Sequence, residues 1–236
     1  MPELHDYASL STGRATWLKD TMKRWTSRQP VARSFLNEFV RDRMGFNDVV
    51  PSLLRDMGVP SSFYERAEPA EPEFDMVYVG SVTKSRGVDR LAQWAIQRRH
   101  SLLLVGTPEL AIEKELSGEP GVTLYGPAKR SEIPDLTRKA RFAFNITPAI
   151  HPLDRQTSTK VLEYLALGMP VITNDYYWIR RFEEESGARM YRFVDFGSLR
   201  LEDVASFPYV IPDMSPYRWD AVWERSGIVD VLASVA

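Results

Sequence analysis

The sequence predicts an α/β fold in which a doubly wound parallel sheet follows a helical N-terminal segment. From Phe74 onward, short apolar runs alternate with stretches whose apolar residues recur at helical spacing. Such alternation is typical of right-handed βαβ units, in which helices cover both faces of one parallel sheet. The chain has 236 residues and is 44% hydrophobic, which suits one large domain, or one domain with part of a second.

The Rossmann-like domain is predicted over residues 74–215. Its expected strands are residues 74–79, 101–105, 122–125, 141–145, 170–173 and 190–193. Its expected helices are residues 88–97, 108–116, 132–139, 159–167 and 178–184. Ligands of such sheets bind at the carboxyl ends of the strands. The loops 80–87, 126–130 and 146–158 should therefore form the site.

The segments on either side of this domain have other patterns. Residues 1–66 are predicted to be helical, with helices over 15–25, 31–43 and 51–57 and no confident strand. The sequence AEPAEPE at 67–73 is rich in Pro and Glu and predicts a hinge or linker. Residues 216–236 predict an amphipathic helix whose apolar residues include Trp219, Trp223 and Ile228.

Composition and charge exclude several classes of function. The net charge of −2 gives no reason to expect a nucleic-acid partner, although residues 1–45 hold eight Lys/Arg against five Asp/Glu. With no cysteine, the chain has no disulfide, thiolate nucleophile or cysteine-bound metal. The three histidines are scattered, so no metal site is predicted. No segment resembles a signal peptide or a membrane span, and a cytoplasmic protein is expected.

The most informative stretch is QTSTKVLEYLALGMPVITN at residues 156–174. Thr157 and Ser158 are good N-cap residues, and Gly168 ends the predicted helix. The free N–H groups at the start of this predicted helix, which include the N–H of Thr159, form an anion site. Lys160 lies in the first turn and suggests that the anion is a phosphate. Glu163 lies three residues later on the same face, where its carboxylate could bind the vicinal diol of a ribose. The alternative interpretation is a capped surface helix with a Lys–Glu pair.

The loops after the first and third predicted strands extend this site. Residues 80–87, GSVTKSRG, form a strand–glycine-turn–helix element that places Lys84 and Arg86 near the same anion. The loop is neither a G-x-G-x-x-G fingerprint nor a G-x-x-x-x-G-K-[ST] motif, so a dinucleotide cofactor and an NTPase are disfavoured. The loop 125–130, YGPAKR, could wrap a nucleobase with its main chain.

These segments, in this order, resemble a known family. YVGSVTKSRGVDRLAQWA, LLLVGTP, VTLYGPAKRSEIPDLTRKARFAFNITP and STKVLEYLALGMPVITND look like the C-terminal half of GT-B glycosyltransferases of the group 1/4 type. This large group includes bacterial polysaccharide and lipopolysaccharide transferases. The resemblance covers roughly residues 74–235, and K-x-x-E-Y-x-A-x-G-x-P-V-I is its most specific part.

The resemblance implies a role for each matching residue. Phosphate of the sugar donor would meet Gly80, Ser81, Lys84, Arg86, Ser158, Thr159 and Lys160. The ribose would meet Glu163, and the base would meet Gly126, Lys129 and Ile133. Ser81 departs from the family, in which an Arg is common. Many retaining members carry a second Glu eight residues before the ribose Glu, and Arg155 stands there instead. His151, Arg155 and Thr157 are candidates for sugar contacts, and no catalytic residue is assigned.

The implied function is metal-independent glycosyl transfer without a cofactor, from a UDP-sugar to a saccharide or lipid-linked acceptor. Residues 1–66 would then be a remnant of the N-terminal GT-B domain, and residues 216–236 would pack toward them. An oligomer, or a peripheral contact with the inner face of the membrane, could complete the acceptor side. The alternatives are a non-catalytic nucleotide-sugar-binding partner subunit, an inactive truncated transferase and, less favoured, a sugar-nucleotide epimerase of the same fold.

Overall fold

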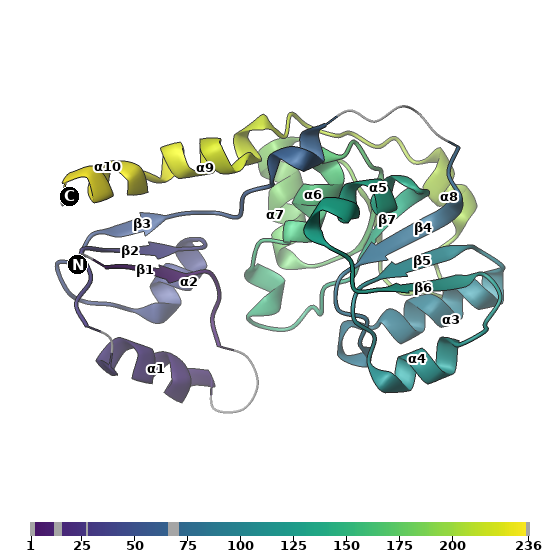
Figure 1. Cartoon of the computed structure of the whole chain (residues 1–236), viewed down its shortest axis with the longest axis horizontal. Coiled ribbons are helices and arrows are strands. Elements are labelled where there is room, and N and C mark those ends of the chain that lie inside the picture. The colour runs from purple at the N-terminus through teal and green to yellow at the C-terminus, as the bar shows by residue number, and fades with distance from the viewer. Residues whose placement is uncertain (1–2, 12–15, 27, 66–70, 235–236) are drawn as a thin grey trace. The chain divides into compact units, whose positions relative to one another are not determined.

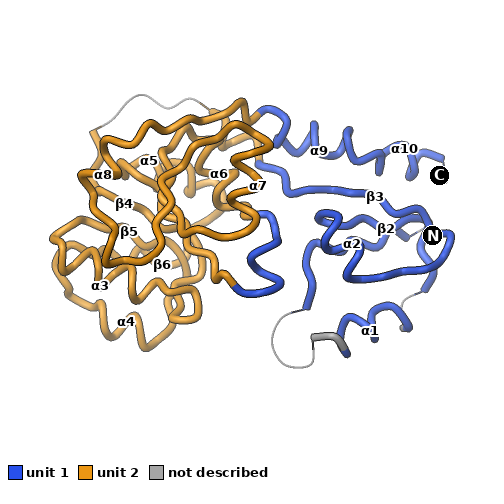
Figure 2. Tube along the Cα trace, turned by 180° about the vertical axis from the view of Figure 1, so that it is seen from behind, with its two compact units in different colours: residues 1–59, 150–157, 215–236 blue, residues 60–149, 158–214 orange. Residues whose placement is uncertain are grey.

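The computed structural model describes residues 3–11, 16–26, 28–65 and 71–234. The chain forms two compact units (Figure 2). One unit contains residues 1–59, 150–157 and 215–236, and the other contains residues 60–149 and 158–214. Both units contain a parallel sheet with flanking helices, which confirms the predicted α/β class. Residues 67–70 of the predicted hinge lie outside the described residues.

The larger unit is built on a six-stranded parallel sheet in the order β6-β5-β4-β7-β8-β9 (Figure 1). The strands are β4 (Phe74–Val79), β5 (Leu102–Val105), β6 (Val122–Gly126), β7 (Ala140–Asn145), β8 (Val171–Asn174) and β9 (Tyr191–Phe193). Each lies within one residue of its predicted position. In chain order, β5 and β6 lie on one side of β4, and the later strands β7, β8 and β9 lie on the other side. This reversal is the topological switch point of a doubly wound fold.

Helices connect these strands and cover both faces of the sheet. The five predicted helices are α3 (Val88–Arg98), α4 (Leu110–Leu116), α5 (Ile133–Arg138), α6 (Thr159–Ala166) and α7 (Tyr177–Ser186). A further helix, α8 (Leu201–Ser206), was not predicted. Figure 1 shows α3 and α4 on one side of the sheet and α5 and α6 on the other. Because β4 and β5 are covered on both faces, the last four residues of β4 and all four residues of β5 are buried, whereas the edge strand β6 alternates between partly buried and exposed residues.

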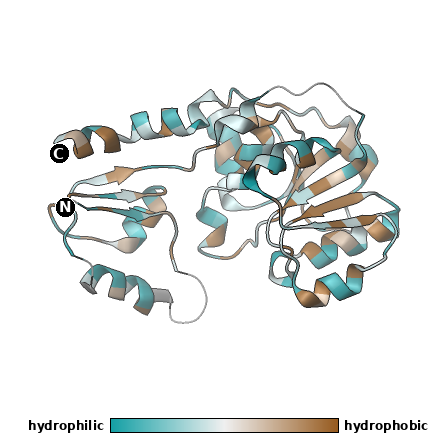
Figure 3. Ribbon diagram, viewed as in Figure 1, coloured by the Kyte–Doolittle hydropathy of each residue, from teal (hydrophilic) through white to brown (hydrophobic). Residues whose placement is uncertain are grey.

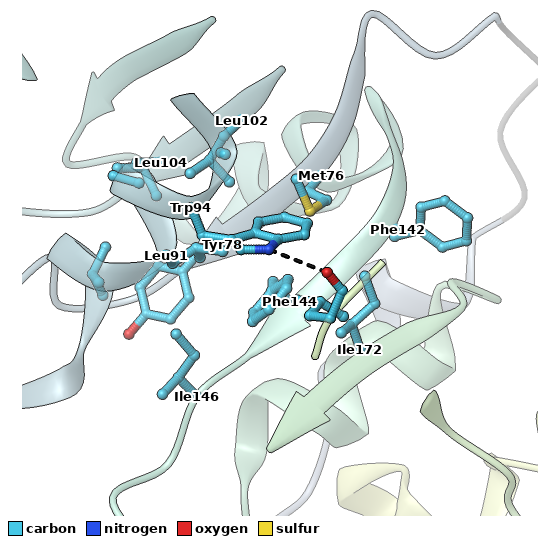
Figure 4. Close-up of a cluster of buried hydrophobic side chains, with 14 of the residues drawn as sticks. Met76, Tyr78, Leu91, Trp94, Leu102, Leu104, Phe142, Phe144, Ile146 and Ile172 are labelled. Atoms are coloured by element: carbon cyan, nitrogen blue, oxygen red, sulfur yellow. Dashed lines mark hydrogen bonds between the residues drawn. The ribbon is translucent and has the colours of Figure 1, made fainter. Parts of the chain in front are cut away.

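One face of the sheet holds an extensive apolar core (Figure 4). Met76 and Tyr78 of β4 are fully buried there and pack with Leu91 and Trp94 of α3. The indole N–H of Trp94 donates a hydrogen bond to the carbonyl oxygen of Leu199 at 3.3 Å, so its polar atom is satisfied in the core. This packing fixes the carboxyl end of β4, from which Gly80 and its loop extend.

The smaller unit corrects the prediction for residues 1–66. It contains the parallel strands β1 (Leu4–Tyr7), β2 (Ala32–Phe35) and β3 (Ser52–Leu54), with the helices α1 (Thr16–Thr26) and α2 (Glu38–Met44). The helices expected over 31–43 and 51–57 were therefore wrong for β2 and β3. All four residues of β2 are buried, including Arg33 and Ser34, so this strand shows no two-residue alternation. The helix begins only after Asn37, whose Oδ1 accepts a hydrogen bond from the N–H of Val40 at 3.0 Å.

The C-terminal segment also departs from the predicted single helix, and Figure 3 shows apolar and polar residues interspersed along it. It contains the short turn η5 (Ser215–Tyr217), then α9 (Trp219–Ser226) and α10 (Ile228–Ser234). Gly227 separates the two helices with a φ of 68°, which favours glycine because it has no side chain. Within this unit, the Trp219 ring packs so closely on Gly58 that a Cβ there would lie 2.3 Å from it.

Candidate functional site

The candidate site lies in the larger unit, at the carboxyl ends of β4 and β7. Gly80 follows β4, Asn145 ends β7, and α6 begins directly after Ser158. A parallel sheet binds its ligand at this position because the connections on either side of the switch point diverge and leave a crevice. The residues below all belong to the larger unit unless stated otherwise.

Lys160 lies in the first turn of α6, next to the end of β4. Its Nζ is 3.2 Å from the Tyr78 hydroxyl and 4.5 Å from the centre of that ring. A Cβ at Gly80 would lie 3.4 Å from the Lys160 side chain, so the lysine passes directly beside the glycine turn. Burial, and then the positive charge of Arg86, lower the pKa of Lys160 to about 8, although Glu163 opposes the shift. An anion bound beside it would favour the charged form of the lysine.

Glu163 lies one turn further along the same face of α6 and is only 4% exposed. Its Oε1 accepts a hydrogen bond from Nη2 of Arg130, which begins the short turn η3 (Arg130–Glu132) after β6. Burial raises the pKa of Glu163, while the positive charges of Arg130 and Lys160 act in the opposite direction. A buried carboxylate with cations on two sides can accept hydrogen bonds from the hydroxyl groups of a ligand.

A buried polar network fixes the start of α6. The Ser158 hydroxyl donates to Oδ1 of Asn145 at 3.2 Å. The Asn145 amide donates to the hydroxyls of Thr173 at 2.9 Å and Tyr176 at 3.3 Å. Ser158 is at the N-cap position as predicted, but its side chain makes no capping bond to the helix. The hydroxyl instead connects the start of α6 to Asn145 at the end of β7, and through Asn145 to Thr173 of β8.

The other predicted phosphate residues lie in the glycine loop with different partners. Arg86 is partly buried, and its charge acts on both Lys160 and Tyr78. Lys84 instead points to α4, where its Nζ lies 3.5 Å from Oε2 of Glu115. Ser81 is exposed, and its carbonyl oxygen accepts a hydrogen bond from the Tyr78 hydroxyl at 3.2 Å. Of the two cations in this loop, Arg86 is thus the one whose charge acts on Lys160.

The predicted base-binding residues lie around the loop that follows β6. Gly126 ends the strand with a φ of 84°, and the N–H of Lys129 donates to Oε2 of Glu132 at 2.7 Å. Ile133 is 8% exposed, at the start of α5. The bond to Glu132 gives the short loop a defined shape, and Arg130 follows it directly.

The predicted sugar-contacting residues belong to the smaller unit. His151 packs edge-on against Phe39 with 4.9 Å between ring centres. The carbonyl oxygen of Arg155 accepts a hydrogen bond from the Asn37 side chain at 3.0 Å. The Thr157 hydroxyl donates to Asp56 at 2.6 Å, and burial raises the pKa of that carboxyl. Their contact with a sugar stays a prediction.

Sequence reasoning missed three side chains of this site: Tyr78, Arg130 and Asn145. Tyr78 and Asn145 looked like ordinary strand residues, and only their position near the carboxyl ends of β4 and β7 could have singled them out. Arg130 was part of the loop assigned to the base, but its pairing with Glu163 joins residues 33 positions apart. No local pattern signals such a pair.

The comparisons with known proteins agree with this fold. The family model described as "Glycosyl transferases group 1" matches residues 73–190, which is 118 of the 236 residues. This chain belongs to that family. The match contains the glycine loop, Arg130 and all of α6, so the candidate site lies within the part of the chain that defines the family. A search of the curated proteins found no match.

Solved glycosyltransferases share the fold of this group 1 chain. AviGT4, from avilamycin A biosynthesis, has a TM-score of 0.54 and 16% identity over 86% of this chain and 60% of its own length. Anabaena Alr3699/HepE in complex with UDP-glucose has a TM-score of 0.64 and 11% identity over 99% and 71% of the two chains. A mutant of phage T4 BGT in complex with UDP-glucose has a TM-score of 0.53 and 10% identity over 98% and 72%. These neighbours confirm the resemblance to GT-B glycosyltransferases.

The described residues lack a membrane-spanning helix and a metal-binding cluster. No helix in residues 3–11, 16–26, 28–65 or 71–234 is long and apolar enough to cross a membrane. Within the same residues, no group of three or more His, Asp or Glu side chains could hold a metal ion.

Proposed function

We propose that the larger unit binds a nucleoside diphosphate sugar at the start of α6, with UDP as the favoured nucleotide. The Lys160–Glu163 pair at the switch point is the observation that carries this proposal. The two side chains share one face of α6 beside the Gly80 turn, and Arg86 adds a second positive charge. Cations and free helix N–H groups suit a diphosphate, and the buried carboxylate suits the ribose diol.

The test is calorimetric titration of the purified chain with UDP, GDP, ADP and their sugars. UDP is expected to bind with a Kd between about 1 μM and 1 mM. Glu163→Gln keeps the size of the side chain but removes the charged acceptor, so affinity should fall about tenfold to a hundredfold.

Glu183→Gln is the matched control for this titration. Glu183 is partly buried, its pKa is likewise raised by burial, and it likewise pairs with an arginine, Arg192, at 3.1 Å. Because it lies on α7 outside the candidate site, its substitution should leave the affinity for UDP unchanged. A well-folded chain that binds none of the nucleoside diphosphates would refute the proposal.

Beyond binding, we infer that the chain transfers the sugar to a saccharide or lipid-linked acceptor without a metal ion. Family membership supports glycosyl transfer, and Lys160, Arg86 and the start of α6 offer positive charge where a diphosphate leaving group would form. The chain spans 60% of the length of AviGT4, so a non-catalytic nucleotide-sugar-binding subunit is the second candidate. Release of nucleotide from a UDP-sugar distinguishes the two.

The proposal also includes peripheral contact with an anionic membrane through α1. Leu18, Met22 and Trp25 follow one another at helical spacing and are 45%, 55% and 83% exposed. Lys19, Lys23 and Arg24 lie on the same helix. Its acidic residue, Asp20, accepts a hydrogen bond from Ser11 and pairs with Lys23 at 3.4 Å, so the helix keeps an excess of positive charge. An exposed apolar stripe flanked by cations is typical of a helix that lies in the interface of an anionic bilayer.

Co-sedimentation with vesicles tests this contact. The chain should sediment with phosphatidylglycerol vesicles and stay in solution with phosphatidylcholine vesicles at low salt, because lipid charge attracts the basic helix. The double variant with Met22→Ser and Trp25→Ser should no longer sediment with the vesicles. Val229→Ser is the control, since Val229 is 57% exposed on α10 rather than α1. Equal sedimentation of the double variant and the wild-type chain would contradict the assignment of α1.

A further inference from the structure

Tyr78 places a hydroxyl group between two segments of the candidate site. It lies near the carboxyl end of β4, and its side chain is fully buried in the core of the larger unit (Figure 4). The hydroxyl donates a hydrogen bond to the carbonyl oxygen of Ser81 at 3.2 Å, and Nζ of Lys160 lies 3.2 Å from the same oxygen. Ser81 belongs to the glycine loop and Lys160 to α6. One buried hydroxyl therefore connects the two segments that offer positive charge to a diphosphate.

The available protons fix the direction of both hydrogen bonds. A tyrosine hydroxyl has one proton and a carbonyl oxygen can only accept, so that proton is committed to Ser81. Burial raises the pKa of Tyr78 to about 12, so the hydroxyl keeps its proton. Its lone pairs are left for Lys160, whose protonated Nζ has three donors and no acceptor. Tyr78 thus holds one N–H group of the lysine and leaves the other two for a ligand.

The lysine is confined near its end, while the helix that carries it is held by another residue. Nζ of Lys160 lies 4.5 Å from the centre of the Tyr78 ring. A Cβ at Gly80 would lie 3.4 Å from Cδ and Nζ of the lysine and 3.5 Å from the Tyr78 hydroxyl. The hydroxyl of Tyr164, also on α6, accepts a hydrogen bond from the N–H of Val79 at 2.9 Å and joins the helix to β4. Loss of the Tyr78 hydroxyl would therefore release the lysine and leave the helix attached.

We propose that Tyr78 is a positioning residue, whose hydroxyl holds the amino group of Lys160 beside the glycine loop so that its two remaining N–H groups meet the diphosphate. The inference rests on the proposed function and deepens it, because it names the group that directs the phosphate-binding lysine. Tyr78 is buried and its one proton is used, so it acts on the ligand through Lys160. Its contribution to affinity must then vanish when the lysine is absent.

Tyr78 also affects the charge of Lys160. A hydrogen bond that is accepted from an ammonium group favours the charged form, so the hydroxyl opposes burial and Arg86, which lower the pKa of the lysine. Glu163 acts in the same direction as the hydroxyl. Within the described residues, Arg86 of the glycine loop, Glu163 of α6 and Tyr78 of β4 are the charged or titratable groups that act on Lys160. Tyr78→Phe should therefore lower the pKa of Lys160 further in the ligand-free chain.

The first measurement is a double-mutant cycle of Tyr78→Phe and Lys160→Met, titrated with UDP by calorimetry at neutral pH. Phenylalanine keeps the ring that fills the core, so the variant should fold, which circular dichroism checks. Tyr78→Phe should weaken binding about tenfold, because the lysine loses its directing hydrogen bond. The same substitution in the Lys160→Met chain should cause no further loss.

Tyr209→Phe is the matched control. Tyr209 packs against the same core as Tyr78, and its hydroxyl is also buried. That hydroxyl has no hydrogen-bond partner among the residues that the structure describes, so it directs no other side chain there. Tyr209→Phe should leave the affinity for UDP unchanged.

The second measurement needs no nucleotide. In a chain labelled with ¹³C at Cε of lysine, an NMR titration follows the ionisation of Lys160, whose signal is assigned by its loss in Lys160→Arg. Tyr78→Phe should move the midpoint to lower pH, and Tyr209→Phe should not. An unchanged midpoint would overturn the positioning role, and so would an equal loss of UDP affinity with and without Lys160. A chain in which the midpoint moves but the wild type binds no nucleoside diphosphate would refute the proposed function, and this inference with it.

Discussion

At the scale of single residues, Lys160 has the most unusual environment in the candidate site. It is placed against the Tyr78 ring beside a second cation, Arg86, and burial is the first cause of its lowered pKa. Tyr78 cannot balance this charge by ionising, because burial raises its own pKa to about 12. The arrangement disfavours the charged lysine in the ligand-free chain and would favour it once an anion is bound.

This environment predicts that nucleotide affinity depends on pH. The second ionisation of a phosphate is complete above about pH 7, so the charge of UDP is then constant. Above pH 8 the ligand-free chain holds Lys160 mainly neutral, and binding of UDP must take up a proton. We expect affinity to fall as pH rises from about 8 to about 9.5, and calorimetry in buffers of different ionisation enthalpy should show proton uptake.

Lys160→Arg is the control for this pH dependence, because arginine stays protonated throughout the range. The variant should bind UDP with an affinity that is flat over the same interval, from about pH 8 to about 9.5. A decline as steep as that of the wild-type chain would assign the titration to another group.

The same lowered pKa affects stability with a definite sign. Between about pH 8, the folded value, and 10.5, the ordinary value, the unfolded chain holds more protons on Lys160 than the folded chain. The contribution of Lys160 to the free energy of unfolding should therefore rise with pH through this window. Lys160→Met should remove that rise, and denaturant titrations of both chains at several pH values would measure it.

At the scale of elements, the start of α6 depends on the polar network around Asn145. Asn145 and Thr173 are fully buried, and Tyr176 is 1% exposed. Asn145→Ala would leave the Thr173 and Tyr176 hydroxyls without this amide and would release Ser158. Buried polar groups that lose a partner cost about 1–3 kcal/mol each, so we expect a loss of at least that size in the free energy of unfolding.

Chemical denaturation measures the loss, and Tyr125→Phe provides the comparison. Tyr125 is 47% exposed at the end of β6, so removal of its hydroxyl should change stability by less than about 0.5 kcal/mol. If Asn145→Ala were as stable as Tyr125→Phe, the network would not fix α6.

The elements also show why the sequence predicted one unit far better than the other. In the larger unit, strands such as β4 and β5 are apolar runs between clear helices, so their type and position follow from composition and spacing. In the smaller unit, β2 has only four residues and includes buried Arg33 and Ser34. Arg33 is buried because Asp48 bonds its guanidinium at 2.6 and 2.7 Å. That long-range pair cannot be recognised from a local pattern, so the local pattern of this stretch predicts a helix instead.

The candidate site was predictable to the extent that its residues share one segment. Lys160 and Glu163 are three positions apart on one helix, so helical geometry alone places them on the same face. Arg130 reaches Glu163 only because the loop after β6 and the helix α6 lie at the same edge of the sheet. Such a contact depends on strand order, which a single sequence does not specify.

At the scale of the whole molecule, the chain passes repeatedly between its two compact units. The predicted nucleotide contacts are in one unit, whereas His151, Arg155 and Thr157 belong to the other. The smaller unit has a sheet of its own, so it is more than the helical remnant that the sequence predicted. Its parallel β1, β2 and β3 with flanking helices resemble the start of a second doubly wound domain.

The transferase interpretation predicts slow release of UDP from a UDP-sugar when water replaces the acceptor. Incubation of the chain with UDP-glucose and UDP-N-acetylglucosamine should produce UDP in proportion to time and protein, detected by chromatography. Lys160→Met should abolish this release, because the departing diphosphate would lose a side-chain cation at the start of α6. Glu183→Gln should release UDP at the wild-type rate, since Glu183 lies on α7 outside the site. If the wild-type chain binds UDP-sugars and leaves them intact, the non-catalytic subunit becomes the better interpretation, and light scattering should then be used to search for a partner chain.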